Sequence, residues 1–331
     1  MAKLKVITLF VAILSLTALA AMETEPVLRI NTTMHSEAIN DISIDAAEKL
    51  LLTCSPDRTA RLWDLASGEL LHVLRPSINK GSEGVLLACA LSPDGQKAVV
   101  GGVTAGNQLN VFDTTSGKIV NLVQQRSMVV TDLQFSPDGR YLAVGHAMEP
   151  AVVYRVEDWE IVKILDSFGE VTKIAFDNSG YMVVVGVENV IRVYNSEFNL
   201  VEEAQFSTGS KPYSIAISPD NTKLAVCFMD SPVPAVLAYP ELALLYEPDA
   251  SGFDMIPNAF TSACFSEDGT KLLGSGNIVE VFDETARWMY REWEDAGRGG
   301  YSDHPVAGFA IMDMKPLSNG GAVFGLSLIH I

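Results

Sequence analysis

From residue 25 onward, short runs of apolar residues alternate with turns built from Ser, Asp, Asn, Pro and Gly. Some runs alternate between apolar and polar positions, which is typical of half-buried strands, and others are apolar throughout, which is typical of strands covered on both faces. No stretch after residue 21 has the 3.6-residue period of an amphipathic helix. The pattern therefore predicts an all-β chain of many short strands.

The turns recur at a nearly constant interval. Six turn signals such as SPDG follow an apolar strand, and they begin at Asp45, Ser92, Ser136, Asp177, Ser218 and Ser266. A seventh, KPLSNGG, begins at Lys315, and neighbouring signals lie 41 to 49 residues apart. This period with about four strands indicates propeller blades, whereas ankyrin and tetratricopeptide repeats are shorter and helical. We predict a β-propeller that is seven-bladed when intact, with six complete blades and part of a seventh here.

The fourth period shows the predicted blade most clearly. VTKIAF (171–176) alternates, DNSG turns, and YMVVVGV (181–187) is almost continuously apolar. ENVIRVYNS (188–196) and FNLVEEAQF (198–206) complete the four strands, with the last one outermost. A ring needs its first and last blades joined to avoid exposed sheet edges. We expect EPVLRIN (25–31) to supply the outer strand of the last blade.

The first period contains His35, Ser55, Asp57 and the dipeptide Trp63-Asp64. These residues resemble the WD40-repeat family, in which a His, a Ser, an Asp and a Trp at such positions form a hydrogen-bonded set. The resemblance implies a structural role for His35, Ser55, Asp57 and Trp63, since a buried indole, imidazole and hydroxyl each need a partner. A Ser–His–Asp catalytic triad is the disfavoured alternative, and we assign no catalytic residue.

The other periods depart from this pattern. At the position of the Trp they carry Phe112, Tyr154, Tyr194, Ala238 and Phe282. None of them has a His at the position of His35. We therefore expect the full polar set in the first blade alone, and apolar packing between the sheets elsewhere.

Four longer segments carry a more specific resemblance, and they are EPVLRINTTMHSEAIN, LLHVLRPSINKGSEG, ALLYEPDASG and GRGGYSDHPVAGFAIMDMKPLSNGG. They resemble the propeller half of certain exported bacterial proteins, many of which also carry a caspase-like protease domain. The resemblance covers roughly residues 26 to 325. It implies a non-enzymatic interaction or sensing scaffold, the regulatory half of a longer chain. Its partners would be proteins of unknown identity and a covalently linked caspase-like domain.

The two ends of the chain are expected to lie outside the propeller, which we place at residues 21–325. Residues 1–20 have the basic start, apolar run and small residues of a signal peptide cleaved after Ala20. We expect a periplasmic or secreted protein with no membrane span after cleavage, and an uncleaved anchor is the alternative. LSLIHI (326–331) resembles the translation of a sequencing adapter, so we treat it as an assembly artefact, with a genuine apolar strand as the alternative.

The formal net charge of -18 becomes -20 when cleavage removes Lys3 and Lys5. Such an acidic chain disfavours nucleic acid and anionic membranes as partners. No glycine-rich loop follows a strand and opens a helix, and no dense Asp spacing resembles a calcium loop, so we expect no cofactor and no metal. The rival hypothesis is a propeller enzyme of the lactonase type, which would need carboxylates or histidines converging on a metal at the channel mouth.

The four cysteines are Cys54, Cys89, Cys227 and Cys264, each in an apolar run. Export would permit disulfides, but buried small hydrophobic side chains are the favoured interpretation. No cysteine has the local pattern of a caspase-like nucleophile, so this chain alone is expected not to be an enzyme.

The segment RWMYREWEDAGRGGY (287–301) concentrates Trp, Tyr and Arg in an otherwise acidic chain. These residue types dominate binding hot spots. We hypothesise that Trp293 and Arg298 contribute to a partner-binding surface. The alternative is that the tryptophans are buried on an outer strand and the arginines neutralise nearby acids.

Overall fold

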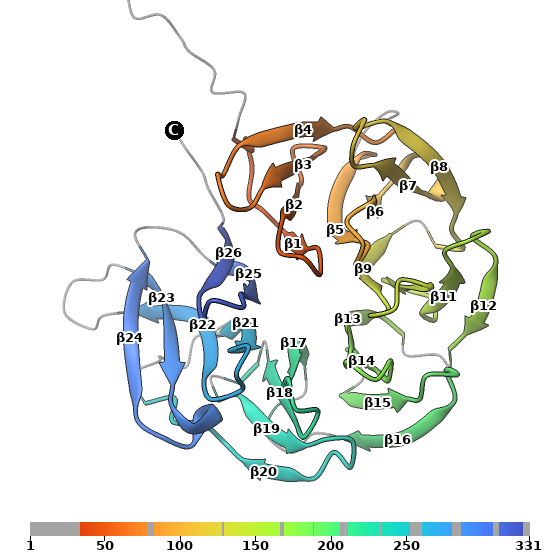
Figure 1. Cartoon of the computed structure of the whole chain (residues 1–331). Coiled ribbons are helices and arrows are strands. Elements are labelled where there is room, and N and C mark those ends of the chain that lie inside the picture. Colours follow the sequence, from red (N-terminus) through yellow and green to blue (C-terminus); the bar gives the residue numbers. More distant parts are fainter. Residues whose placement is uncertain are drawn as a thin grey trace, which may run out of the picture. The chain divides into compact units, whose positions relative to one another are not determined.

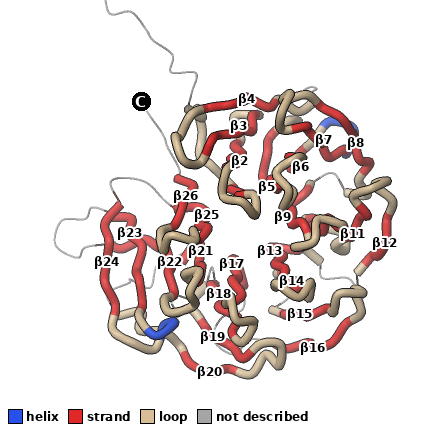
Figure 2. The backbone as a smooth tube through the Cα atoms, in the orientation of Figure 1, coloured by secondary structure: helices blue, strands red, loops and turns tan. Residues whose placement is uncertain are grey.

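The computed structural model describes residues 34–77, 83–127, 129–165, 169–187, 189–205, 209, 211–228, 230–231, 233–251, 260–279, 286–306 and 311–326. They form six four-stranded antiparallel sheets and one two-stranded sheet, and two short 3-10 segments, Ala105–Asn107 and Asp295–Gly297, are the helical elements among them. Figure 1 shows the sheets standing radially around a central axis, and Figure 2 shows how strand and turn alternate along the chain. The predicted all-β propeller, with six complete blades and part of a seventh, is confirmed.

The sheets, numbered as blades in chain order, have the following strands. Blade one contains β1 (Asp41–Ile44), β2 (Leu50–Ser55), β3 (Thr59–Asp64) and β4 (Leu70–Leu74). Blade two contains β5 (Val85–Leu91), β6 (Lys97–Val103), β7 (Gln108–Asp113) and β8 (Ile119–Gln124). Blade three contains β9 (Val130–Phe135), β10 (Tyr141–His146), β11 (Val152–Arg155) and β12 (Ile161–Ile164). Blade four contains β13 (Val171–Phe176), β14 (Met182–Gly186), β15 (Val190–Tyr194) and β16 (Leu200–Gln205).

The last three blades follow the same order. Blade five contains β17 (Pro212–Ile217), β18 (Lys223–Phe228), β19 (Ala235–Ala238) and β20 (Leu244–Tyr246). Blade six contains β21 (Phe260–Phe265), β22 (Leu272–Val279), β23 (Ala286–Trp293) and β24 (Tyr301–Val306). Blade seven contains β25 (Ile311–Pro316) and β26 (Ala322–Leu326). The first strand of each blade is innermost, and each contacts the first strand of the next blade, including β25 with β1.

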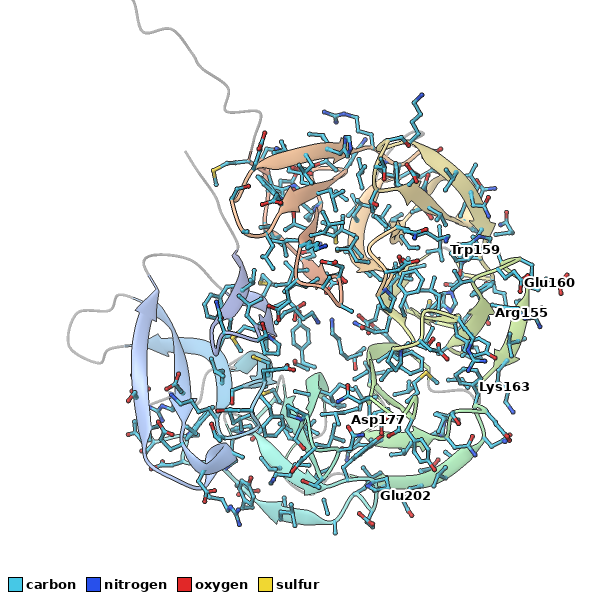
Figure 3. All side chains as sticks on the ribbon, viewed as in Figure 1. Arg155, Trp159, Glu160, Lys163, Asp177 and Glu202 are labelled. Carbon is cyan, nitrogen blue, oxygen red and sulfur yellow. The ribbon has the colours of Figure 1, made fainter. Side chains whose placement is uncertain are left out.

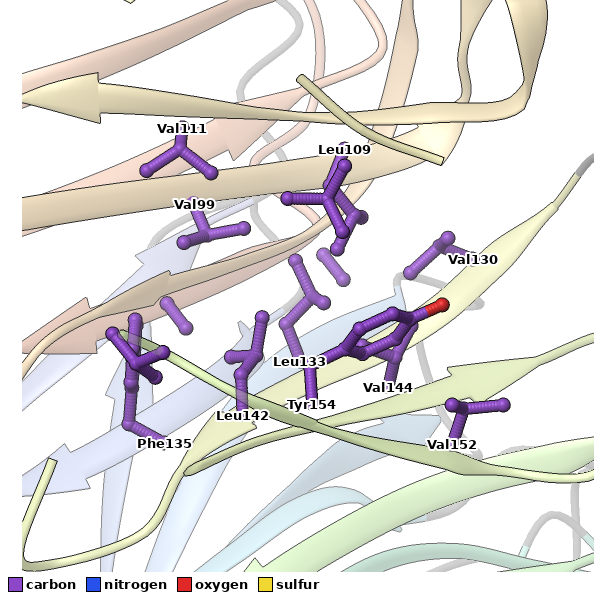
Figure 4. Packing of buried hydrophobic residues seen from close by; sticks show 14 residues of the cluster. Val99, Leu109, Val111, Val130, Leu133, Phe135, Leu142, Val144, Val152 and Tyr154 are labelled. Carbon is purple, nitrogen blue, oxygen red and sulfur yellow. The ribbon is translucent and has the colours of Figure 1, made fainter. Parts of the chain in front are cut away.

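The core lies between neighbouring sheets. Between blades two and three, for example, Val99 and Val111 face Leu133, Leu142 and Tyr154 in one buried cluster (Figure 4). Strands in the middle of a blade are buried on both faces, as the continuous apolar runs predict, while the outermost strands are largely exposed.

The outermost strands form the rim of the propeller. Lys163 of β12 and Glu202 of β16 point outward there (Figure 3).

The recurring turn has one hydrogen-bond pattern. In the third blade, Ser136 Oγ donates to Asp138 Oδ1 at 2.7 Å and accepts the Tyr141 N–H at 3.0 Å, while Asp138 also accepts the Arg140 N–H. Gly139 supplies the left-handed residue, with φ of 71°. The turns at Ser92, Ser218 and Ser266 repeat the serine bonds, so this pattern explains the periodic signal.

Strand register corrects two of the expected positions. Trp63 lies opposite Leu51, near the start of β2, and Phe112, Tyr154 and Tyr194 likewise lie opposite the first or second residue of the second strand in blades two to four. In blade five the equivalent residue is Leu237, opposite Leu224, so the assignment of Ala238 is wrong by one residue. In blade six it is Trp293, opposite Leu272, because β22 and β23 have eight residues each. Phe282 lies outside the described residues.

The interpretations of the two chain ends stay predictions. The signal peptide at residues 1–20, the strand expected at 25–31 and most of the segment 326–331 lie outside the described residues. Among the helices that the described residues form, none has the length and apolar character needed to cross a membrane.

Candidate functional site

The central channel is surrounded by one repeated position of the innermost strands, four residues before the turn signal in blades one to six and two residues before the KPLSNGG signal in blade seven. In five of the seven blades its side chain accepts the N–H that lies one position later in the next innermost strand. The bonds run from the N–H groups of Cys89, Ile174, Ala263, Met314 and Ile42 to Asp41, Asp132, Ser214, Ser262 and Asp313, at 2.8, 2.6, 3.3, 3.1 and 3.4 Å respectively. The last of these joins blade seven to blade one.

A second set of bonds comes from the residue one place before the repeated channel position. Asn40 Nδ2, Thr131 Oγ1 and Thr172 Oγ1 donate to carbonyl oxygens of the next innermost strand, at 2.8, 2.6 and 3.0 Å. The polar side chains around the channel therefore link neighbouring blades, because each satisfies a backbone group of the next blade.

At the repeated channel position, blade four carries Lys173 instead of an acceptor. Its Nζ lies 3.1 Å from Asp132 Oδ1 and 3.4 Å from Asp41 Oδ1. The side chain of Lys173 is 17% exposed, and those of Asp132 and Asp41 are 0% and 3% exposed. One ammonium group therefore joins carboxylates from blades three and one, and Lys315 Nζ lies 3.4 Å from the remaining one, Asp313.

Beside these groups the channel opens into a cavity of about 230 Å³, whose lining includes Asn40, Glu170, Thr172, Lys173 and Tyr213. The rival enzyme hypothesis requires carboxylates that converge here, and the structure does bring three together. However, Lys173 and Lys315 lie where a cation would be needed, and backbone N–H groups use the other carboxylate oxygens of Asp41 and Asp132. Across the described ranges, no three His, Cys, Asp or Glu side chains are placed to hold a metal ion.

Burial raises the pKa of Asp41 to about 7, and the neighbouring Asp313 and Asp132 carboxylates add to the effect while Lys173 and Lys315 oppose it. The pKa of Asp41 in the folded chain thus exceeds its unfolded value of about 4. The folded state holds a proton that the unfolded state releases, so this group's contribution to stability falls between about pH 4 and about pH 7.

The Asp41→Asn variant tests this linkage. Asn keeps an acceptor for the Cys89 N–H but cannot ionise, so the unfolding free energy of the variant relative to the original chain should rise with pH across that window. Urea unfolding at several pH values between about 4.5 and about 7.5 measures the difference. Two parallel stability curves would show that Asp41 titrates normally.

The polar set of the first blade is present, with one residue corrected. His35 Nδ1 lies 2.9 Å from Asp57 Oδ2, and His35 Nε2 lies 2.8 Å from Thr53 Oγ1. Trp63 Nε1 donates to the same Thr53 Oγ1 at 3.1 Å. Ser55 is not in this chain of bonds, because its Oγ accepts the Asp57 N–H at 3.2 Å instead. The hydroxyl that links the imidazole to the indole therefore belongs to Thr53.

Asp57 anchors the far end of this set. Burial alone would raise the pKa of Asp57, but hydrogen bonds from His35, Thr59 and the Ser36 N–H lower it well below its usual range. The carboxylate is therefore charged and fully committed to neighbouring donors. This stabilises the folded state above about pH 4, and the contribution is lost only as pH falls through the lowered pKa.

A pair of substitutions compares how much the hydroxyls of Thr53 and Ser55 contribute to stability. Thr53→Val removes the shared hydroxyl without changing the side-chain shape and leaves the Trp63 and His35 nitrogens without a partner, so we expect a loss of about 1–3 kcal/mol in unfolding free energy. Ser55→Ala removes one bond to a backbone N–H and should cost about 0.5–1.5 kcal/mol. Urea unfolding of both variants gives the order, and a larger loss for Ser55→Ala would restore Ser55 to the central position.

The segment proposed to bind a partner divides into a buried and an exposed part. Trp293 is 0% exposed, and its Nε1 donates to the Asp249 carbonyl at 2.8 Å. Its side chain is therefore part of the core between blades five and six, which corrects the expectation that it is available on the surface. Arg298 is exposed and lies 3.5 Å from Asp295 and 5.4 Å from the centre of the Tyr246 ring. Partner binding by Arg298 stays a prediction.

A second arginine in this segment is structural. Arg291 is 1% exposed, its guanidinium forms two hydrogen bonds with Asp303, at 2.6 and 2.8 Å, and it stacks 3.6 Å from the centre of the Tyr301 ring. It also donates to the carbonyl oxygens of Asp249 and Ser251. Blade six thus ties the connection after β20 to its own outer strands.

Comparison with known proteins fits this geometry. The family model "WD domain, G-beta repeat" matches residues 27–64 and 118–148. The chain contains WD40 repeats. Echinoderm microtubule-associated protein-like 1 of Homo sapiens is 30% identical over 124 residues, which are 38% of this chain and 14% of that protein. Pre-mRNA-processing factor 19 of Oryza sativa subsp. japonica is 26% identical over 205 residues, which are 59% of this chain and 38% of that protein.

The matches cover well under half the length of either relative, so they establish the repeats and not the activity of a whole protein. The WD40 repeats agree with the hydrogen-bonded set of the first blade, whose His, Thr, Asp and Trp lie within or beside the first matched stretch.

The second matched WD40 stretch reaches the third blade, where a different buried polar set occurs. Tyr154 Oη donates to Gln125 Oε1 at 3.3 Å, and the same oxygen lies 3.2 Å from His146 Nε2. His146 is 0% exposed, and burial lowers its pKa. The expectation that blades after the first depend on apolar packing alone is therefore wrong for blade three. A Tyr at the Trp position and a nearby Gln and His were the available signal.

All four cysteines of this WD40 chain are buried and free in the structure, as small hydrophobic side chains would be. Burial raises the pKa of each thiol, which is the opposite of what a cysteine nucleophile requires.

Proposed function

We propose that this WD40 chain is the propeller of an exported bacterial protein and acts as a non-enzymatic scaffold that binds or senses other proteins. It would be the regulatory half of a longer chain with a caspase-like domain. The WD40 repeats support the scaffold, and the segments that resemble exported bacterial propellers support the context. The propeller fold supports many different functions, so the function must be inferred from the residues of the site and not from the fold.

The proposal rests mainly on the bonds that the polar side chains of the central channel form. Polar side chains that converge at a channel mouth are the usual starting point for a propeller active site. Here they bond the backbone of the next blade or pair with Lys173 and Lys315. The polar side chains described around the channel therefore join neighbouring blades.

One observation favours the rival lactonase-type enzyme, namely the convergence of Asp41, Asp132 and Asp313. Calorimetric titration with Ca²⁺ and Zn²⁺, together with lactone and ester hydrolysis assays, separates the two functions. The scaffold predicts no stoichiometric binding and no metal-dependent turnover. Metal-dependent hydrolysis that disappears in the Asp132→Asn variant would establish the enzyme instead.

Two further experiments address the context. A fusion of residues 1–25 to alkaline phosphatase, which is active only outside the cytoplasm, should be active in bacteria, and a Leu14→Arg change in the apolar run should abolish the activity. Reading the gene past codon 325 in its source DNA should reveal a caspase-like domain in frame. An inactive fusion would remove export from the proposal, and a reading frame without a protease domain would remove the linked partner.

A further inference from the structure

Two of the four cysteines lie in the buried cluster between blades one and two. Cys54 is on β2 and Cys89 on β5. Cys89 Sγ lies 3.5 Å from the carbonyl oxygen of Asp41, the cross-strand partner of Cys54 on β1, and 3.8 Å from that of Leu52, which is on β2 with Cys54.

The nearness of these two cysteines follows from the repeated hydrogen bonds around the channel. Cys54 pairs across the sheet with Asp41, and Asp41 accepts the N–H of Cys89. At any blade boundary of this kind, two residues come close together through the channel side chain. One is its cross-strand partner, and the other is the residue of the next blade that donates its N–H to it. The position of Cys89 is therefore fixed by the bond that joins the two blades.

Blades five and six provide a matched comparison within the same chain. Cys227 pairs with Ser214, and Ser214 accepts the N–H of Ala263, so Ala263 is the equivalent of Cys89. Cys264 is one residue further along, and successive strand residues face opposite ways. Cys264 accordingly packs with Leu273 and Met314 in a different cluster from Cys227.

We propose that Cys54 and Cys89 form a disulfide that joins blade one to blade two when the chain folds in an oxidising environment. Two thiols lose two protons and two electrons to form one S–S bond. The electrons pass by thiol–disulfide exchange to a small disulfide such as oxidised glutathione, which becomes two thiols. Because both thiols are buried in the native state, exchange takes place during folding, before the blades close over them.

This inference does not depend on the identity of any partner. The test is to unfold and reduce the full chain, refold it with oxidised and reduced glutathione, and map the linked peptides by mass spectrometry. The expected product is a folded monomer with a Cys54–Cys89 link and a mass lower by two hydrogens. Its thermal midpoint should lie roughly 5 to 10 °C above that of the reduced chain.

The comparison pair supplies the controls. Cys264→Ala should keep the Cys54–Cys89 link, Cys89→Ala should lose it, and Ala263→Cys should create a second link to Cys227. If Cys89→Ala does not fold, peptide mapping of the refolded original chain is by itself sufficient to test the inference. A folded product without the Cys54–Cys89 link, or with an equally abundant Cys227–Cys264 link, would overturn the inference.

Discussion

Replacing Lys173 by Met is expected to lower the free energy of unfolding by about 3–5 kcal/mol. The Lys173 ammonium lies 3.1 and 3.4 Å from carboxylates of Asp132 and Asp41 that are almost completely buried. Removing it leaves negative charge in a region of low dielectric constant with no cation from blade four, and such unpaired buried charges are costly. Met keeps most of the length and apolar surface of the lysine side chain, so the loss reports the charge.

Urea unfolding measures this change, and Lys118→Met is the matched control because Lys118 is exposed on the loop between β7 and β8. The control should change the unfolding free energy by no more than about 0.5 kcal/mol. The Lys173→Met loss should be larger at neutral pH than at acidic pH, since protonation of the carboxyl groups removes the unpaired charge. A loss no greater than that of the control would mean that the ammonium does not hold the blades.

Replacing Trp293 by Ala is expected to cost about 3–5 kcal/mol, the range for deleting a fully buried aromatic side chain. Its indole fills the space between blades five and six with Ala225, Val236 and Leu272. The substitution also removes the bond from Nε1 to the Asp249 carbonyl. The chain loses both the packing of a large ring and a link between the blade five connection and β23.

Trp293→Phe separates the two contributions, since it keeps a ring and removes the donor, and it should cost less than the alanine variant. Arg298→Ala is the control in the same segment and should be nearly neutral for stability. Thermal and urea unfolding provide the measurements. A nearly neutral Trp293→Ala would mean that the indole is free for a partner, as the sequence alone had suggested.

The sequence predicted the blades well because the turns are local. The run 171–176 coincides with β13, and the four strands of that blade were placed within two residues of their ends. A Ser or Asp that bonds nearby backbone groups is specified within six residues, so its signal survives without knowledge of the rest of the chain.

Register is where prediction failed, because it depends on how long a neighbouring strand becomes. Blade six extends β22 and β23 to eight residues, which moves the Trp position from the expected Phe282 to Trp293. Thr53 and Ser55 lie on the same face of β2, so alternation cannot distinguish them. Pairing places Thr53 opposite Arg61, two residues from Trp63, and Ser55 farther away opposite Thr59.

The channel site was missed for a different reason. Asp41 and Asp132 lie four residues before their turn signals and Asp313 lies two residues before the seventh signal, so an alignment of the repeats was needed to reveal them. The reach of Lys173 across the axis has no such signal. It arises only when blades distant in sequence meet around a common centre.

The most direct test of this account is a double-mutant cycle between Lys173→Met and Asp132→Asn, measured by urea unfolding. If channel side chains join the blades, the two substitutions should be strongly non-additive, with a coupling energy of about 1–3 kcal/mol. Additivity within about 0.5 kcal/mol would contradict the claim, because it would mean that the ammonium and the carboxylate do not interact in the folded chain.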